Sequence, residues 1–377
     1  MSGVSVKAIE LPRDSEAFIR AWWPIYDGDE HWVPPLIGER KTFFNPAKNP
    51  YFKVADVQCF MAYKGNEAVG TIAATVDHYQ QKTDPNVGLF GFFEFIEDAE
   101  VARALFEAAC DWLRGRGMER AWGPFNFNSN HEFGLLVEGF DTDPCIANPH
   151  NHAYYVDLYE GLGMKKVTDW YAYWLDAGPV PPRIERIANR VLDRHPEITI
   201  EQANLKNFNA EVEKFWEIYN DAWEHNWGHI FLSKEEFLFA AQNLKSVLDE
   251  RLVWWAYVDG KLAGASLTIP DYNQVAKKMN GKIFPFGWFH FLTGRRKIDQ
   301  LRVFVLGVKK EFQRLGLGGP LYMRTWEECV KLNIRGAEAS LVLESNRSMR
   351  GALEKLGATV YKTYRSYEFE LNQGSEN

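Results

Sequence analysis

Seven consecutive residues combine three glycines with two long polar side chains: Gln313-Arg314-Leu315-Gly316-Leu317-Gly318-Gly319. A strand-like run, Leu301 to Leu306, precedes this loop, and a helix-like run, Pro320 to Leu332, follows it. Glycines allow positive φ and close approach of a ligand to the backbone. A helix N-terminus adds unpaired N–H groups and the positive end of a dipole. The loop therefore predicts a cradle for a pyrophosphate, and with it a nucleotide-type cofactor.

Two common phosphate loops do not fit the spacing. A dinucleotide fold needs a third glycine in G-x-G-x-x-G, and none follows Gly318 at the required place. A P-loop needs Lys and Ser or Thr after its last glycine, whereas Pro320 follows Gly319. A glycine-rich helix-entry turn that binds nothing stays as the simplest alternative.

The loop matches Gln/Arg-x-x-Gly-x-Gly/Ala and so resembles the acyl-CoA pyrophosphate loop of the GNAT acyltransferase superfamily. After it come a buried-strand run to Leu343, then Asn346, a helix closed by Gly357 and a final strand, Tyr361 to Leu371. The resemblance implies a mixed-sheet α/β (α+β) fold, an acyl-CoA co-substrate and no metal. Many members carry a tyrosine where this chain has Leu353. The CoA contacts that it implies are Leu306, Gly307, Val308, Gln313, Arg314, Leu315, Gly316, Leu317, Gly318 and Gly319.

Weak self-similarity indicates an internal duplication. The pairs Gly70 and Gly264, Gly163 and Gly357, and His31 and His225 all lie 194 residues apart. Each half is expected to begin with helices and continue into a hairpin that turns at Gly65-Asn66 or Asp259-Gly260. We predict two tandem GNAT-like domains, residues 1–176 and 183–377, joined by a proline-rich linker at 177–182.

The two predicted domains differ at the helix entry. In the first, strand Val87 to Phe95 leads through Glu97, Asp98 and Glu100 into a helix without any glycine. Those carboxylates would repel a phosphate. We therefore assign acyl-CoA to the second domain, and give the first a structural or acceptor-pocket role.

Catalysis needs a base that takes a proton from an ammonium so that a free amine attacks the thioester. Glu224 and His225 are candidates, although Glu30-His31 recurs in the first half and favours a structural role. Glu344 is another candidate base, and Asn346 would hold the pantetheine or polarise the leaving sulfur. No activated Cys or Ser is evident, so attack is expected to be direct.

Other polar and aromatic residues are candidates for acceptor binding. Asn126, Asn128 and His131 lie in WGPFNFNSNHEF, where alternation places both amides on one face, or where they simply form a solvated loop. Tyr154 and Tyr155 could line an acceptor site or belong to a helix cap.

A distinct insert, Pro270 to Lys297, contains FPFGWFHFL followed by Gly294-Arg295-Arg296-Lys297. Trp288 and its neighbours suit an anionic membrane interface, a lid over a long acyl chain, or packing against the other domain. The first two interpretations imply an apolar, lipid-like substrate.

Composition and charge narrow the possible partners and cellular location of the protein. A net charge of −8 disfavours nucleic acid as a partner. Four dispersed cysteines, no apolar leader and no long apolar run predict a cytoplasmic enzyme. The insert, with Trp122 to Asn126 and Tyr154-Tyr155, resembles the bacterial ceramide-synthase-like group. That resemblance implies a long-chain acyl donor and a sphingoid amine acceptor on the inner membrane face, which the enzyme would contact transiently. Acetylation of a small or protein amine, and a non-catalytic acyl-CoA sensor, stay as alternatives.

Overall fold

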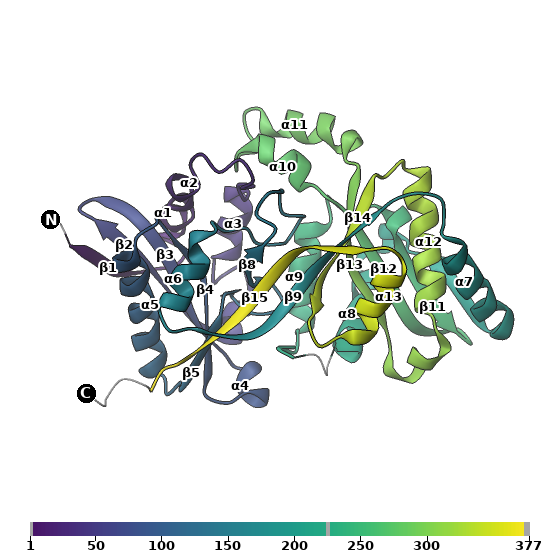
Figure 1. The fold of residues 1–377 in the computed structure, drawn as a ribbon, viewed down its shortest axis with the longest axis horizontal. Helices are drawn as coiled ribbons and strands as arrows, with labels where there is room; N and C mark the ends of the chain where they lie inside the picture. The colour runs from purple at the N-terminus through teal and green to yellow at the C-terminus, as the bar shows by residue number, and fades with distance from the viewer. Residues whose placement is uncertain (1–2, 224–226, 373–377) are drawn as a thin grey trace. The chain divides into compact units, whose positions relative to one another are not determined.

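A computed structural model describes residues 3–223 and 227–372. The chain forms two compact units. Unit 1 consists of Met1–Trp170, Val275–Leu292 and Lys362–Asn377, and unit 2 consists of Tyr171–Gln274 and Thr293–Tyr361. Figure 1 traces the chain and labels its elements. The predicted fold class is confirmed, because mixed sheet and helices alternate in both units.

Unit 1 has a sheet with strand order β1-β2-β3-β4-β5-β15. Neighbours are antiparallel except β4 and β5, which run parallel. Its strands are β1 (Val4–Ile9), β2 (Ala55–Lys64), β3 (Glu67–Asp77), β4 (Val87–Phe95), β5 (Arg120–Gly123), β8 (Leu135–Glu138) and a two-strand pair, β6 (Phe125–Asn126) and β7 (Glu132–Phe133). Its helices are α1 (Ser15–Arg20), α2 (Trp22–Ile25), α3 (Ile37–Phe43), α4 (Gln80–Thr83), α5 (Ala99–Arg114), α6 (Tyr154–Gly161) and α11 (Gly287–Gly294).

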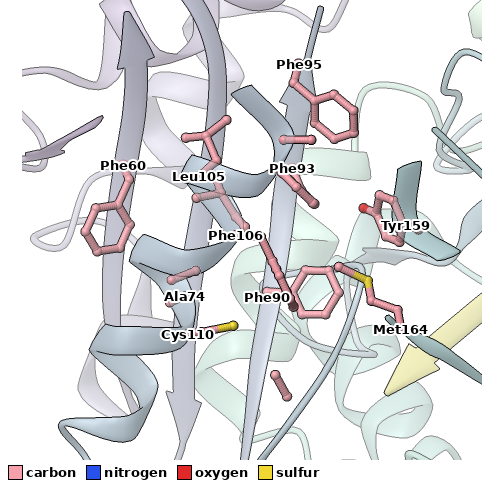
Figure 2. Close-up of a cluster of buried hydrophobic side chains, with 14 of the residues drawn as sticks. Phe60, Ala74, Phe90, Phe93, Phe95, Leu105, Phe106, Cys110, Tyr159 and Met164 are labelled. Carbon is pink, nitrogen blue, oxygen red and sulfur yellow. The ribbon is translucent and has the colours of Figure 1, made fainter. Parts of the chain in front are cut away.

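Helix α5 supplies one wall of the unit 1 core. Its apolar residues recur at helical spacing, so Val101, Leu105 and Phe106 are all buried on one face. All three belong to one cluster with Phe90 and Phe93 of β4, and Figure 2 shows Leu105 and Phe106 beside these phenylalanines. This packing fixes the end of β4 against the start of α5.

Unit 2 repeats the plan with strand order β9-β14-β13-β12-β11-β10. Here the parallel pair is β13 and β14. Both β9 and β15 contribute residues to both units. The strands are β9 (Lys165–Asp176), β10 (Ile198–Gln202), β11 (Val253–Val258), β12 (Lys261–Pro270), β13 (Gln300–Val308), β14 (Gly336–Leu343) and β15 (Thr359–Glu370). The helices are α7 (Pro182–Arg194), α8 (Phe208–Trp223), α9 (Lys234–Leu244), α12 (Gly318–Lys331) and α13 (Arg347–Lys355), and α10 (Asn273–Met279) lies at the boundary.

The duplication is confirmed at the level of strand register. The β2–β3 hairpin has an irregularity between Ala62 and Tyr63, and the β11–β12 hairpin has one between Ala256 and Tyr257, again 194 residues on. Gly70 pairs with Phe95 in unit 1, as Gly264 pairs with Val308 in unit 2. Phe95 and Val308 are therefore equivalent positions.

One expectation about element order is wrong for the first repeat. That repeat begins with strand β1 rather than with helices, whereas helix α7 comes first in the second repeat, before strand β10. Both β1 and β10 are short edge strands with one buried residue each, and five of six and four of five residues, respectively, are at least partly exposed. Such strands lack the apolar run by which the other strands were recognised.

Candidate active site

The predicted phosphate loop is a tight turn at the start of α12. A 3-10 turn, Lys310–Leu315, ends at Gly316, whose φ of 78° lies in the left-handed region that favours glycine. Leu317 then caps α12, which begins at Gly318, two residues before the predicted start. Leu317 has no side-chain oxygen, so the helix has no side-chain cap of its own.

The amide hydrogens of this turn are largely unused. The Gly319 N–H donates to the Gly316 carbonyl at 3.1 Å, and the Leu321 N–H donates to the Leu317 carbonyl at 3.2 Å. In the part of the chain that the structure describes, the amides of Gly316, Leu317 and Gly318 have no acceptor. Three consecutive donors at the positive end of a helix form a suitable site for an anion.

Two glycines of the loop serve different needs. A Cβ on Gly319 would lie 2.9 Å from Cγ2 of Ile187 in α7, so Gly319 lets the two helices pack closely. A Cβ on Gly318 would meet nothing within 4 Å. Space therefore remains beside Gly318, next to the unused amides.

The loop's polar side chains are both exposed. The Gln313 amide donates to the Val308 carbonyl at 3.3 Å and so ties the loop to the end of β13. Arg314 lies on the same turn, where a guanidinium can balance phosphate charge.

Strands β13 and β14 separate beside the loop. Their pairing runs from Gln300 and Gly336 to Val303 and Ala339 and then stops. An irregularity at this level shifts the register of β13 against β12, and β13 continues along β12 as far as Val308. The predicted residues Leu306, Gly307 and Val308 therefore lie on a strand with one edge no longer paired to β14. Such an edge can pair with the amides of an extended ligand.

A buried polar cluster marks the point of separation, and it was not predicted from the sequence. Arg302 of β13 and Glu338 of β14 lie 3.8 Å apart, with 7% and 0% of their side chains exposed. Tyr361 and Ser340 both donate to the Glu338 carboxylate. The signal that could have revealed the cluster is one charge in each of two otherwise apolar strands.

The structure describes two of the four candidate catalytic residues, Glu344 and Asn346. Glu344 is half-buried just after β14. Asn346 caps α13, because its Oδ1 accepts from the Met349 N–H at 3.1 Å, which leaves only its amide nitrogen for a ligand. Glu224 and His225 lie outside the described residues. His31 is the counterpart of His225 in the first repeat. Its Nδ1 lies 2.9 Å from Oδ1 of Asp143, a contact expected of a structural residue.

Unit 1 has an equivalent helix entry, but a carboxylate occupies it. The Asp98 side chain accepts from the N–H groups of Glu100 and Val101 at 2.8 and 3.2 Å. The Lys64 ammonium hydrogen-bonds the same carboxyl and lowers its pKa. The donors that a phosphate would use are thus already satisfied.

The edge of β4 in unit 1 is also occupied. Asn126 accepts from the Phe92 N–H at 2.7 Å. Tyr154 donates to the Phe95 carbonyl at 2.6 Å, and the Phe95 N–H donates to the Tyr155 hydroxyl at 2.9 Å. These groups would otherwise be open to a pantetheine, so unit 1 offers it no free edge.

The other predicted acceptor residues lie in the same unit and have protein partners. Asn128 is buried and donates to Asp77 at 2.8 Å. His131 packs its ring edge-on against Phe43 and Tyr51, and burial lowers its pKa to about 3, which keeps it neutral. A direct contact of these residues with substrate stays a prediction.

The insert docks within unit 1 and leaves an apolar patch exposed. The Trp23 indole donates to Asn280 at 2.7 Å, and the Ile37 N–H donates to the Gly281 carbonyl at 3.0 Å. Phe284 is 76% exposed and Phe286 is 74% exposed. The apolar patch comprises Ile283, Phe284, Phe286, Trp288, Phe289 and Leu292.

Among the described residues, no group of three or more His, Cys, Asp or Glu side chains could hold a metal ion. No described helix has the length and apolar character needed to cross a membrane.

Comparison with known proteins places this geometry in a class. No family model matches the chain. A tandem GNAT protein from the clavulanic acid biosynthesis pathway superposes with a TM-score of 0.58 at 11% identity, over 99% of this chain and 100% of that one. A GCN5-related N-acetyltransferase from Sphaerobacter thermophilus superposes with a TM-score of 0.54 at 13% identity, over 99% and 98%. The fold is that of a tandem GNAT protein.

Two curated relatives are much closer in sequence. The bacterial ceramide synthase of Caulobacter vibrioides is 36% identical over 377 residues, 98% of each chain. Protein YghO of Escherichia coli K12 is 33% identical over 368 residues, 95% of this chain and 93% of that one. The chain belongs to the family of the bacterial ceramide synthase, and it is an acyltransferase.

Proposed function

We propose that the protein transfers an acyl group from acyl-CoA to an amine, with the acyl-CoA bound in unit 2. The observation that carries this proposal is the set of unused amides at Gly316, Leu317 and Gly318, beside strands that separate. Those amides donate hydrogen bonds to the CoA diphosphate, and Arg314 balances its charge. The unpaired edge of β13 receives the pantetheine, which brings the thioester to Leu306–Val308.

The transfer itself is a direct displacement. The amine nitrogen attacks the thioester carbonyl and a C–N bond forms, while a β13 backbone N–H stabilises the oxyanion. The C–S bond then breaks, the thiolate leaves with CoA, and the proton that the attacking nitrogen loses is transferred to that thiolate. In this proposal the Asn346 amide nitrogen donates to the leaving sulfur. No covalent acyl-enzyme is required, since all four cysteines are buried.

The proposed substrates are a long-chain acyl-CoA and a sphingoid-type amine. Identity of 36% over nearly the whole chain to a protein named a ceramide synthase supports this choice. The second candidate, acetylation of a small or protein amine, rests on structures at 13% identity or less, which share the fold alone. We therefore favour the lipid amine.

A lipid substrate requires access to a membrane, and we propose the apolar patch as the contact. Two of its phenylalanines are more than 70% exposed, which costs free energy in water. Lys282 is exposed, and so are Arg295, Arg296 and Lys297 at the end of the insert. Aromatic side chains with adjacent cations suit the anionic cytoplasmic face of the inner membrane.

Thiol release with matched donors tests the proposed reaction. We expect sphinganine to release CoA thiol from palmitoyl-CoA much faster than from acetyl-CoA. Lysine methyl ester and a peptide with a free N-terminus serve as non-lipid acceptors. Preference for acetyl-CoA would select the second candidate, and no release with any pair would contradict both.

Vesicle sedimentation tests the membrane contact. The triple variant Phe286→Ser, Trp288→Ser and Phe289→Ser should lose binding to vesicles that contain phosphatidylglycerol. The matched control, Val330→Ser with Val360→Ser, removes two exposed apolar side chains elsewhere and should bind as the wild type does. Equal sedimentation of the triple variant and the control would reject the patch as the contact.

A further inference from the structure

Unit 1 places a single carboxylate in an apolar strand. Strand β4 reads VGLFGFFEF, and Glu94 is its only charged residue. The Glu94 Oε2 accepts from the Tyr26 hydroxyl at 2.6 Å and from the Tyr155 hydroxyl at 3.0 Å. Among the described residues Glu94 has no ion-pair partner, and its Oε1 has no hydrogen-bond donor, although the residue keeps partial contact with solvent. One oxygen is therefore anchored and the other is available.

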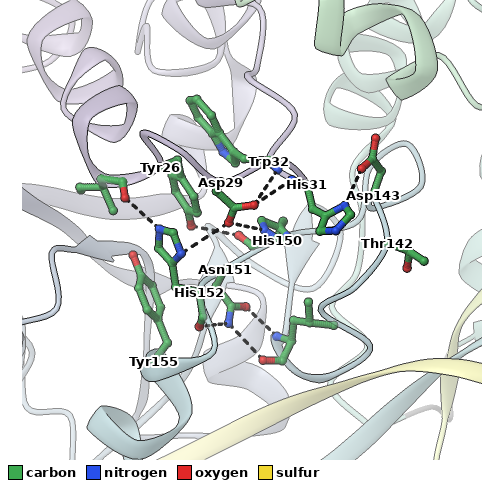
Figure 3. A network of polar contacts seen from close by, with 12 residues as sticks. Tyr26, Asp29, His31, Trp32, Thr142, Asp143, His150, Asn151, His152 and Tyr155 are labelled. Carbon is green, nitrogen blue, oxygen red and sulfur yellow. Dashed lines mark hydrogen bonds and ion pairs between the residues drawn. The ribbon is translucent and has the colours of Figure 1, made fainter.

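The tyrosine that anchors Glu94 is itself held on several sides. The Tyr26 ring stacks on the rings of Trp32 and His152, with 4.8 Å between centroids in both cases. The Tyr26 hydroxyl also lies 3.0 Å from the His150 carbonyl. Asp29 lies 2.9 Å from Nε2 of His150 and 3.4 Å from Nδ1 of His152, and these contacts hold this wall of the site together (Figure 3). The position of the carboxylate is thus set by the fold rather than by a ligand.

The charges around Glu94 favour a positive ligand. The pKa of Glu94 is raised to about 7: burial raises it most, the Tyr26 and Tyr155 hydroxyls lower it, and the carboxylate of Glu132 raises it slightly. Glu132 is already paired with Arg40. The other titratable groups facing Glu94 are tyrosines, and burial raises the pKa of each, so they stay neutral donors: Tyr26, Tyr154, Tyr155 and Tyr159.

We propose that unit 1 is the amine-binding unit, with the ammonium group of the acceptor donating a hydrogen bond to Oε1 of Glu94. An ammonium has three N–H donors, a charge opposite to that of the site, and a size that fits one free carboxylate oxygen. The assignment of this amine as the acyl acceptor rests on the proposed function, whereas its binding does not. Unit 1, whose helix entry is occupied by Asp98, would thus bind a positively charged ligand instead of a phosphate.

The same arrangement allows proton transfer. The ammonium N–H bond breaks, its electron pair stays on nitrogen, and the proton moves to Oε1 of Glu94. The Tyr26 hydroxyl can then donate to the His150 carbonyl instead of to Glu94, so both protonation states keep their hydrogen bonds. The product is a neutral amine, the form that attacks a thioester.

Calorimetric titration of the full chain with decylamine, without any acyl-CoA, tests the proposal. We expect Glu94→Gln to weaken decylamine binding 10- to 100-fold, the loss of one charge-assisted hydrogen bond of roughly 1.5–3 kcal/mol. Binding of decanol, which has the same chain without the charge, should not change. The affinity for CoA should not change either, so failure here is separable from failure of the proposed function. Equal decylamine affinity in Glu94→Gln and wild type would overturn the assignment.

Two further variants test whether the change in decylamine binding is specific to the Glu94 carboxylate. Glu107→Gln removes an exposed charge of α5 and should bind decylamine as the wild type does. Tyr26→Phe with Tyr155→Phe keeps the carboxylate but removes both donors, which raises its pKa. Decylamine binding should therefore fall with decreasing pH from about 7 in the wild type, and from a higher pH in the double variant. Identical pH profiles of decylamine binding in the wild type and the double variant would contradict the proposal.

Discussion

The two units begin an equivalent helix in opposite ways. In unit 1 the carboxylate of Asp98 accepts from the first amides of α5. In unit 2 the amides of Gly316, Leu317 and Gly318 have no acceptor among the described residues, and Leu317 stands at the N-cap of α12 without a side-chain acceptor. The neighbouring strand edges differ in the same sense, since Tyr154 and Tyr155 occupy β4 whereas β13 is no longer paired to β14 beyond Val303. One duplicated framework can thus keep or lose a phosphate site through a single capping carboxylate and a few side chains.

Adding the unit 1 charge to unit 2 should have the largest effect. Gly318→Glu puts a carboxylate into the free space beside the unused amides. Repulsion of the CoA diphosphate at about 4 Å costs roughly 4 kcal/mol, which corresponds to about a 1000-fold loss of CoA affinity. Gly318→Ala supplies the control, because it adds a Cβ without charge and should bind CoA within a few-fold of wild type. Equal affinity of the two variants in calorimetry would show that the diphosphate binds elsewhere.

Glu338 of unit 2 and Glu94 of unit 1 differ in their counter-charge. Glu338 has Arg302 beside it, whereas Glu94 has no ion-pair partner among the described residues. Glu338→Gln therefore leaves a buried guanidinium without its partner and should cost roughly 3 kcal/mol of unfolding free energy. Urea denaturation measures this, with the exposed Glu311→Gln as reference. A loss below about 0.5 kcal/mol would mean that the pair does not hold β13 and β14 together.

Glu94→Gln, unlike Glu338→Gln, should raise the unfolding free energy relative to the wild type at high pH. The folded-state pKa, about 7, lies above the ordinary 4.5, so the folded state holds this proton more tightly than the unfolded chain. The stability that protonation provides is complete below about pH 4.5 and is lost as the pH rises to about 7. Over that window the wild type should lose roughly 3 kcal/mol relative to Glu94→Gln. Paired thermal melts at pH 4.5 and 7.5 check this, and parallel curves would refute the raised pKa.

Removing the unit 1 cap should have the smallest effect. Asp98→Ala leaves two amides of α5 without an acceptor and should cost about 1 kcal/mol of stability. It should not create a second CoA site, because the β4 edge stays occupied. A CoA stoichiometry of two in this variant would show that the cap alone had closed unit 1.

Local sequence predicted the parts of the site that depend on neighbouring residues. Glycine at 316, the apolar runs of β13 and β14, and the acidic entry to α5 each act within a few positions, so their consequences were visible in the chain. Arg302, Glu338 and Glu94 were missed because a charge inside an apolar strand gains meaning only from the strands beside it. The partners of Tyr154, Tyr155 and Asn126 were missed for the same reason, and no local pattern indicates that β9 and β15 serve both units.

Hydrogen exchange of the helix-entry amides tests the central claim most directly. Peptides that cover residues 313–321 and 97–104 are compared with and without saturating CoA. We predict strong protection of the first peptide on CoA binding and none of the second, since only the first has amides left for a phosphate. CoA binding that leaves residues 313–321 unprotected would contradict the account.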